Sequence, residues 1–245
     1  MSSKVYGRPS SLNDKVFTYC PGCGHGIVHR LLAETLDEME ITGDTIGVAY
    51  VGCGAMLYDL FNIDFAFPLH GRAPAVATGI KRVRPEKIVF TYQGDGDLAA
   101  IGTTEIVHAA SRGENLTTFF VNNGTYGMTG GQMAPTTLIG QKSSTCVDGR
   151  DADYHGRPIR MSEMLAQLDG VCYVERVTID TPKHINDAKN AIKKAFVNQQ
   201  EKKGFSMVEI ISPCPIGWGY NPVDAYAHIK EEVLPFYSLG VFKDR

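Results

Sequence analysis

The chain has 245 residues, of which 43% are hydrophobic and 21% charged, and its formal net charge is -3. This length is ordinary for one large α/β domain, and the average charge content excludes disorder as the dominant state. The mild negative charge argues against a nucleic-acid partner, and no apolar run approaches the ~20 residues that a membrane helix needs.

The predicted elements alternate between strands and helices after a polar N-terminal arm at residues 1–18. Apolar, β-rich runs predict strands at 45–51, 87–92, 116–121, 171–177 and 206–211. Helical periodicity predicts helices at 26–39, 73–82, 98–110, 162–168 and 183–199. This alternation predicts a doubly wound α/β fold with a mostly parallel sheet covered on both faces. Ligands of such folds bind beyond the carboxyl ends of the strands.

Two segments fall outside this alternation. Residues 123–158 are rich in Gly, Thr and Ser without a clear period, and loops of more than ~15 residues are commonly functional or disordered. Residues 223–236 are amphipathic and are expected to pack as a helix or to contact another subunit. The N-terminus contains no apolar stretch typical of a signal peptide, so we expect a cytoplasmic protein.

Polar residues follow two successive predicted strands. Gly94-Asp95-Gly96-Asp97 comes after the strand at 87–92, and Asn122-Asn123-Gly124-Thr125 ends the next one. Adjacent parallel strands would bring a carboxylate, an amide oxygen and the Thr125 carbonyl together, which are ligands that suit Mg²⁺ shared with a diphosphate. The glycines permit close backbone approach. Alone, the first segment could be an ordinary strand-to-helix turn. The pair is more specific and resembles the thiamine-diphosphate-binding motif, which assigns Asp95, Asn123 and Thr125 to Mg²⁺.

Four cysteines lie in predicted loops. Cys20 and Cys23 form a C-x-x-C segment, Cys53 follows the first strand and Cys214 follows the last. A C-x-x-C segment alone fits zinc, a redox dithiol or an iron–sulfur cluster. A zinc ribbon would normally show a second such segment, whereas four thiolates suit a [4Fe-4S] cluster. Of the other two cysteines, the one at position 172 is expected to be a buried small hydrophobe, and the one at 146 is expected to be a free thiol.

Together, the two constellations resemble the β-subunit of the 2-oxoacid:ferredoxin oxidoreductases. The match runs from YCPGCGHG at 19–26 to SPCP at 212–215, and includes PLHGRAPAVATGIK, YQGDGDLAAIG and VNNGTYGMTGGQMAPTT. The run TYGMTGGQMAPTT is more similar to the branched-chain (2-oxoisovalerate) members than to the 2-oxoglutarate members. The resemblance implies a single thiamine-diphosphate-binding domain over 1–245, with an N-terminal arm and a C-terminal extension that carries cluster ligands.

The resemblance also implies a reaction and its cofactors. It implies oxidative decarboxylation of a 2-oxoacid with coenzyme A, which gives acyl-CoA, CO₂ and electrons for ferredoxin. The implied cofactors are thiamine diphosphate, Mg²⁺ and a [4Fe-4S] cluster. The implied partners are a pyrimidine-binding subunit that supplies the activating glutamate and a ferredoxin-like subunit. The implied cofactor contacts come from Cys20, Cys23, Cys53, Cys214, His25, Gly94, Asp95, Gly96, Asp97, Asn123, Thr125, Tyr126 and Gly127.

His70 and Arg72 are candidate catalytic residues, because both lie in a glycine-containing loop and could contact the diphosphate or the substrate carboxylate. His70 could instead cap the helix that begins at Ala73. His25 could hydrogen-bond the cluster or the cofactor, or cap the helix that follows it.

Other functions remain open at this point. The same reaction could act on 2-oxoglutarate or an aryl 2-oxoacid. A non-oxidative thiamine-dependent decarboxylase would need no cluster, so the four cysteines count against it. A structural iron–sulfur or zinc subunit for electron transfer or assembly would need no thiamine diphosphate, and the paired Asp95 and Asn123 segments count against that.

Overall fold

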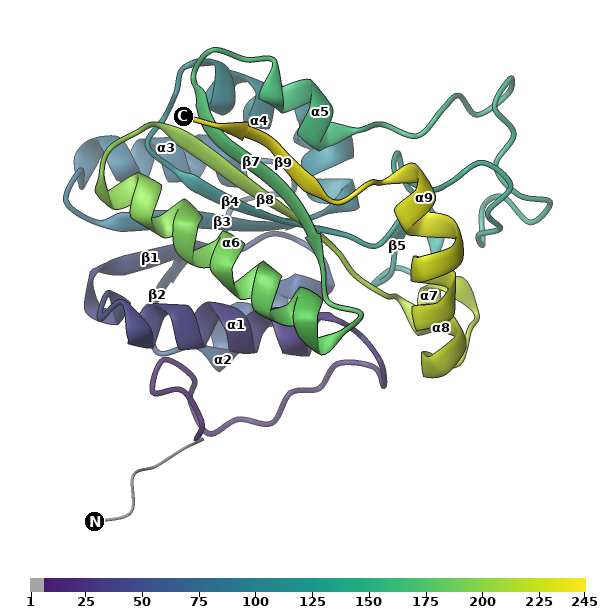
Figure 1. The fold of residues 1–245 in the computed structure, drawn as a ribbon, viewed down its shortest axis with the longest axis horizontal. Coiled ribbons are helices and arrows are strands. Elements are labelled where there is room, and N and C mark those ends of the chain that lie inside the picture. Colours follow the sequence, from purple (N-terminus) through teal and green to yellow (C-terminus); the bar gives the residue numbers. More distant parts are fainter. Residues whose placement is uncertain (1–6) are drawn as a thin grey trace.

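The computed structural model describes residues 7–245, and a seven-stranded sheet forms its centre (Figure 1). The strand order is β2-β1-β3-β4-β8-β7-β9, and every neighbouring pair is parallel except β7 with β9. The strands are β1 (Thr45–Val48), β2 (Asp64–Ala66), β3 (Ile88–Gly94), β4 (Thr117–Asn122), β7 (Val171–Thr178), β8 (Phe205–Ile211) and β9 (Gly240–Asp244). The predicted doubly wound α/β fold is therefore confirmed.

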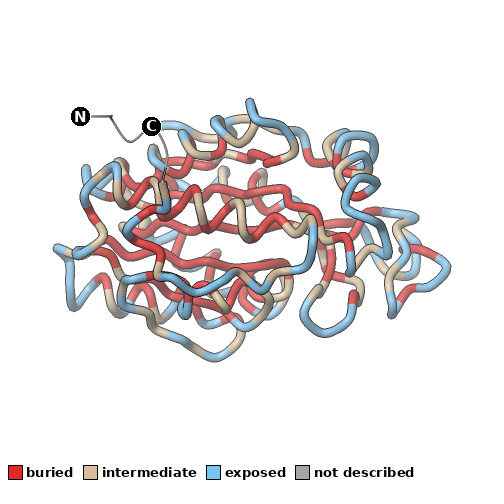
Figure 2. The backbone as a smooth tube through the Cα atoms, turned by 90° about the horizontal axis from the view of Figure 1, so that it is seen from below, coloured by how far each residue is buried: buried red, intermediate tan, exposed pale blue. Residues whose placement is uncertain are grey.

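Helices cover both faces of this sheet (Figure 1). One face carries α1 and α6, which pack against each other and share a core with the strands. The other face carries α3, α4 and α5 over a second core. These helices are α1 (His25–Glu38), α3 (Ala73–Val83), α4 (Thr103–Ser111), α5 (Met161–Ala166) and α6 (Pro182–Gln200). The strands β1, β3, β4, β7 and β8 are buried almost throughout (Figure 2), which explains their continuous apolar runs, whereas the edge strands β2 and β9 are partly exposed.

Several predicted elements differ from the structure. The helix predicted at 98–110 is two helices, a π-helix at Gly96–Ile101 and then α4. They are separated at Gly102, where a Cβ atom would lie 2.2 Å from the Asp97 carbonyl oxygen. The short strand β2 and the antiparallel edge strand β9 were not predicted. Residues 1–6 of the predicted arm lie outside the described residues.

The remaining segments lie at one end of the molecule. The long segment after β4 contains a two-stranded hairpin, and the end of the chain forms short helices beside it (Figure 1). These elements are β5 (Thr125–Tyr126), β6 (Gln132–Met133), α7 (Pro215–Trp218), α8 (Pro222–His228), a π-helix (Ile229–Val233) and α9 (Leu234–Phe236). Near the N-terminus, α2 (Leu57–Leu60) follows β1 through a 3-10 turn. No helix within residues 7–245 is long and apolar enough to cross a membrane.

Candidate functional site

A cavity of about 310 Å³ lies at the carboxyl edge of the sheet. The segments that leave β1, β3 and β4 line it, because these three parallel strands all end at this edge. Its lining includes the Gly94–Asp97 and Thr125–Thr129 segments, together with Tyr50, His70 and Asn123. The cavity therefore lies where the fold predicts a ligand.

Asp95 and Asn123 meet at the floor of this cavity. Asp95 is 3% exposed, and its Oδ2 accepts a hydrogen bond of 3.1 Å from the Asn123 N–H. Its Oδ1 accepts a hydrogen bond from the Thr136 hydroxyl. Burial raises the pKa of Asp95 to about 7, although these hydrogen bonds oppose the rise. The prediction that both residues follow adjacent parallel strands is confirmed.

This set of oxygen atoms fits a divalent cation. The Asn123 Oδ1 lies 3.3 Å from the Thr125 N–H that donates to it, so the amide oxygen is held within the turn whose Asn123 N–H bonds Asp95. A buried carboxylate without a neighbouring cationic side chain is stabilised in its charged form by a hard metal ion. Asp95, Asn123 and the Thr125 carbonyl are the residues that would hold Mg²⁺.

The buried Asp97 carboxylate fixes the loop that contains His70 and Gly71 through hydrogen bonds. Its Oδ1 accepts hydrogen bonds from His70 Nδ1 (2.6 Å) and from the Gly71 N–H (2.7 Å), and its Oδ2 accepts one from Gln93 Nε2 (2.7 Å). Both carboxylate oxygens are thus engaged by protein groups. Because His70 Nδ1 donates to Asp97, Nε2 is the imidazole nitrogen that can meet a ligand in the cavity.

Arg72 does not reach the cavity. It is the residue before α3, and its guanidinium pairs with Glu105 of α4. The structure therefore brings His70 to the site and leaves Arg72 outside its lining. His70 does not cap α3 either, because the N-cap position is that of Arg72.

The glycines of the Gly94–Asp97 segment accommodate aromatic rings. A Cβ atom on Gly94 would lie 2.9 Å from the Tyr50 hydroxyl, and one on Gly96 would lie 2.9 Å from the ring of Tyr126. The sequence predicts close approach of the diphosphate to these glycines, and the groups that approach them in this structure are these two rings. They narrow the cavity on either side of Asp95.

Four thiols gather at one side of the cavity, and Cys53 is among its lining residues. A Cβ atom on Gly127, a lining residue, would lie 3.1 Å from the Cys214 sulfur and 3.6 Å from the Cys53 sulfur. Cys23 lies near enough to Cys20, Cys53 and Cys214 for their charges to interact. The sequence-predicted set therefore comes together in space.

The electrostatics of these thiols fit a positively charged group. Burial raises the pKa of Cys23 to about 11 and that of Cys214 to about 12, and neighbouring thiolates add to both shifts. A bound iron centre would lower the pKa of these thiols instead, because a coordinating thiol is deprotonated outright. Within residues 7–245, no three His, Cys, Asp or Glu side chains are placed to hold one metal ion. A cluster is wider than a single ion, so its cysteine ligands lie farther apart than those of one zinc ion.

His25 lies between the thiols and the sheet. It is the first residue of α1, and the N-cap residue is Gly24, so the imidazole does not cap the helix. Its Nδ1 lies 2.8 Å from the Tyr92 hydroxyl, and its ring stacks on Tyr19 at 5.2 Å. Burial lowers the pKa of His25 to about 4. Its contacts in the structure are thus with tyrosines, and it lies two residues after Cys23 in the sequence.

Sequence reasoning missed three residues that shape the site. Tyr50 lines the cavity, Thr136 binds the Asp95 carboxylate, and Trp218 Nε1 donates to the Asn123 carbonyl at 2.8 Å. Thr136 lies inside the quoted run at 121–137, but neither it nor Trp218 was assigned a role, because both lie in segments without periodicity. The two remaining cysteines lie apart from this set. Cys172 is buried in β7, as predicted, and Cys146 is a buried thiol 3.7 Å from His155 Nε2.

Comparison with known proteins agrees with this geometry. A family model described as thiamine pyrophosphate enzyme, C-terminal TPP binding domain, matches residues 51–210. The whole chain is 45% identical to the ketoisovalerate oxidoreductase subunit VorA of Methanothermobacter thermautotrophicus and covers 54% of it. The chain thus spans about half the length of that relative. It is 36% identical to the 2-oxoglutarate synthase subunit KorB of Archaeoglobus fulgidus, over 92% of this chain and 84% of KorB.

A solved structure shares the fold. The 2-oxoglutarate:ferredoxin oxidoreductase from Magnetococcus marinus matches with a TM-score of 0.80 and 23% identity, over 99% of this chain and 86% of that one. The family model covers most of the chain, and KorB is matched over most of its own length. The chain therefore belongs to the thiamine pyrophosphate enzymes, through their C-terminal TPP-binding domain, and among them to the 2-oxoacid oxidoreductase subunits.

Proposed function

We propose that this chain is the thiamine-diphosphate- and [4Fe-4S]-binding catalytic subunit of a 2-oxoacid:ferredoxin oxidoreductase. The reaction converts a 2-oxoacid and coenzyme A to acyl-CoA and CO₂, and passes two electrons to ferredoxin. One observation carries the proposal. The Asp95–Asn123 pair and Cys53 line a single cavity, and the Cys214 thiol lies directly behind its lining residue Gly127. An oxidative decarboxylation needs its carbon chemistry and its electron acceptor this close together.

In this proposal, the chain's own residues bind the cofactors and orient the substrate. Asp95, Asn123 and the Thr125 carbonyl would hold Mg²⁺, and the cation would hold the diphosphate. Thiamine diphosphate, when bound, supplies the carbon nucleophile and the electron sink. The His70 Nε2 faces this cavity and is placed to hydrogen-bond an anionic group of the substrate or the cofactor. Cys20, Cys23, Cys53 and Cys214 would hold the cluster.

A branched-chain 2-oxoacid is the favoured substrate. Identity to the ketoisovalerate oxidoreductase subunit is 45%, against 36% to a 2-oxoglutarate synthase subunit, which supports the branched-chain assignment. Three exposed side chains at the cavity are apolar, Val51, Ile101 and Met128, each at least 39% exposed. Apolar walls suit an aliphatic side chain better than a second carboxylate.

A second subunit completes the site in this proposal. Thiamine enzymes need a glutamate that hydrogen-bonds the aminopyrimidine ring, and we assign it to a pyrimidine-binding partner. Glu105 is engaged with Arg72, while Glu34 and Glu38 pair with Lys189 of α6. These acids thus have structural partners away from the cavity. The exposed apolar side chains at the cavity mouth give such a partner a surface to cover.

The content of an anaerobically purified sample tests the cofactor assignment. We expect about four irons with matching sulfide in this chain when it is purified by itself, and one thiamine diphosphate per chain in the assembled complex. Zinc without thiamine would overturn the proposal in favour of a structural metal subunit. Thiamine diphosphate without iron would point instead to a non-oxidative decarboxylase.

Steady-state kinetics of the assembled complex test the substrate. With coenzyme A and ferredoxin present, kcat/KM is compared for 2-oxoisovalerate, 2-oxoglutarate, pyruvate and an aryl 2-oxoacid. We expect 2-oxoisovalerate to give the highest value. A preference for 2-oxoglutarate would overturn the branched-chain assignment and leave the cofactor assignment standing. The purified chain without its partner is expected to be inactive.

A further inference from the structure

Thr136 fixes the Asp95 carboxylate from the protein side. Thr136 is 1% exposed, and its hydroxyl donates to Asp95 Oδ1, while the Asn123 N–H donates to Oδ2. Each carboxylate oxygen therefore has one hydrogen bond from the protein. This sets the rotation of the carboxylate and directs its remaining lone pairs. Thr136 lies 41 residues from Asp95 along the chain, so this bond depends on the folding of the long segment after β4.

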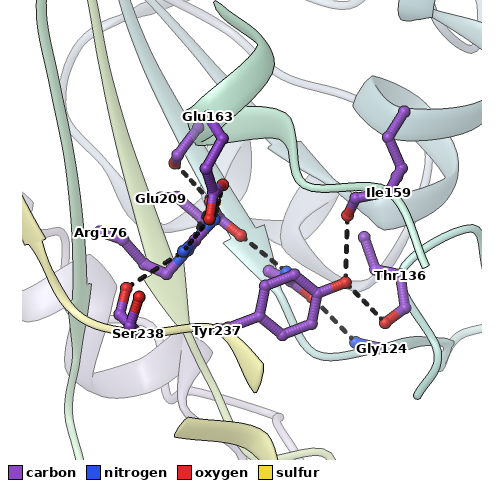
Figure 3. A network of polar contacts seen from close by, with 10 residues as sticks. Gly124, Thr136, Ile159, Glu163, Arg176, Glu209, Tyr237 and Ser238 are labelled. Atoms are coloured by element: carbon purple, nitrogen blue, oxygen red, sulfur yellow. Dashed lines mark hydrogen bonds and ion pairs between the residues drawn. The ribbon is translucent and has the colours of Figure 1, made fainter. Parts of the chain in front are cut away.

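Thr136 is itself held in place by the end of the chain (Figure 3). The Tyr237 hydroxyl lies 2.9 Å from the Thr136 carbonyl oxygen and 3.1 Å from the Ile159 carbonyl oxygen. Next to it, the Thr137 hydroxyl donates to the Gly124 carbonyl at 2.6 Å. The threonine pair thus ties the segment after β6 to both the carboxylate and the turn that follows β4.

Glu209 fixes the same turn from the other side. Its Oε1 accepts a hydrogen bond of 2.7 Å from Asn122 Nδ2, and the Asn122 Oδ1 accepts one of 3.2 Å from the Gly124 N–H. Glu209 is fully buried in β8, and Arg176 of β7 donates to its Oε2 at 2.9 Å. Arg176 also pairs with Glu163 (Figure 3). The ion pair with Arg176 therefore fixes the Glu209 side chain, which bonds Asn122 in the turn that contains Asn123.

We propose that Thr136 and Glu209 are positioning residues for the divalent cation, acting through Asp95 and through the Asn122–Gly124 turn. This inference rests on the proposed function, because it takes Asp95 and Asn123 as the ligands of Mg²⁺. Residues that hydrogen-bond metal ligands orient them, and losing one typically costs about 10–100-fold in metal affinity. Neither residue touches the cation in this proposal.

A purely structural role is the competing explanation. Buried hydrogen bonds contribute to stability wherever they lie, so a loss of stability alone would not distinguish the two. The Mg²⁺ concentration that half-saturates thiamine diphosphate binding does distinguish them. It reports on the ligand geometry, whereas the thermal midpoint of the metal-free complex reports on the fold.

The test uses the assembled oxidoreductase complex stripped of thiamine diphosphate and Mg²⁺, with binding followed by calorimetry. Thr136→Val removes the hydroxyl at nearly constant volume, and Thr136→Ser restores it. Thr178→Val is the matched control, because this buried threonine of β7 bonds the Ile211 carbonyl instead of a metal ligand. We expect Thr136→Val to raise the half-saturating Mg²⁺ at least about tenfold. Thr136→Ser should return it close to the wild-type value, and Thr178→Val should leave it there.

Each outcome decides between the hypotheses. An unchanged Mg²⁺ requirement in Thr136→Val, or an equal rise in Thr178→Val, overturns the inference while the proposed function stands. A wild-type complex that binds no thiamine diphosphate with Mg²⁺ overturns the proposed function itself. Should Thr136→Val fail to fold, Glu209→Gln provides the decision. Ser162→Ala is its control, because Ser162 bonds Glu209 and does not contact the turn. Glu209→Gln should raise the Mg²⁺ requirement and Ser162→Ala should not, and equal effects would overturn the inference.

Discussion

The indole Nε1 of Trp218 donates a hydrogen bond of 2.8 Å to the backbone carbonyl of Asn123. The Trp218 N–H in turn donates to the Cys214 carbonyl at 2.9 Å. One residue thus joins the turn that carries a thiol of the proposed cluster to the turn that carries a proposed Mg²⁺ ligand. One side-chain and one backbone hydrogen bond from this single residue thus connect the two halves of the site.

Replacing Trp218 is expected to weaken both the proposed Mg²⁺ site and the proposed cluster site. Trp218→Phe keeps an aromatic ring and removes the donor to Asn123. A lost hydrogen bond of this kind costs about 1 kcal/mol, or about fivefold in affinity. We expect the thiamine diphosphate affinity to fall by that factor and the iron content to fall with it. Tyr220→Phe, at a neighbouring aromatic of the same region, serves as control. A fall in one measurement without the other would contradict the coupling.

The metal-free protein is expected to lose stability as the pH rises towards neutrality. Burial raises the pKa of Asp95 from 3.8 to about 7, so the folded state holds a proton that the unfolded state releases. The protonated Asp95 carboxyl therefore contributes its full stabilisation of the folded state below about pH 4, and this contribution is lost as the pH rises through about 7. Asp95→Asn should remove this contribution.

Thermal unfolding in a chelator at pH 5 to 8 measures this effect. As the pH rises, the thermal midpoint of wild type should fall relative to that of Asp95→Asn. Mg²⁺ should stabilise the wild type more at pH 8 than at pH 5, because the ion competes with the proton. A pH-independent gap would show that Asp95 keeps an ordinary pKa.

A methyl group at position 127 is expected to displace iron. In Gly127→Ala the new Cβ atom would lie 3.1 Å from the Cys214 sulfur, and overpacking of this kind costs about 1–3 kcal/mol. We expect reduced iron content with little change in the far-ultraviolet circular dichroism. Gly79→Ala in α3 is the control, because its Cβ atom meets nothing within 4 Å. Full iron occupancy in Gly127→Ala would place the cluster elsewhere.

His70 and Arg72 are expected to differ in their effects on turnover. His70→Asn can keep the donor to Asp97 while removing the nitrogen available to a ligand, so kcat of the complex should fall at least about tenfold. Arg72→Gln breaks a half-exposed pair with Glu105 worth at most about 1 kcal/mol, and should leave kcat nearly unchanged. Equal losses in both variants would restore Arg72 to the catalytic site.

The framework of the fold could be predicted because its signals are local. The apolar runs at 87–92 and 116–121 are the buried strands β3 and β4, and the periodicity at 26–39 is α1 within one residue at each end. Strands buried on both faces show continuous apolar sequence, and that pattern needs no tertiary information. The positions of Asp95 and Asn123 followed directly, since each lies just beyond a strand end.

The remaining features depend on contacts between distant segments. The helix after Asp95 is interrupted at Gly102 because the Gly71 backbone approaches there, 2.7 Å from where a Cβ atom would lie. Strand β9 is a short antiparallel edge strand, and its pairing with β7 includes a register shift. Thr136 acquires its role only when the long segment folds back onto Asp95. The pairing of Arg72 could not be predicted because its partner, Glu105, lies 33 residues away.

The glycine at position 127 has a consequence for how the two halves of the site communicate. With no side chain at position 127, the sulfur atoms of Cys214 and Cys53 come close to the lining of the cavity, because a Cβ atom there would lie 3.1 Å and 3.6 Å from them. Charges inside a protein interact more strongly than charges at the same distance in water. In the proposed enzyme, a change of one unit of charge at the sulfur atoms would therefore alter the potential in the cavity without any movement of the backbone. The oxidation state of the cluster and the affinity for a charged ligand would thereby be linked by distance alone.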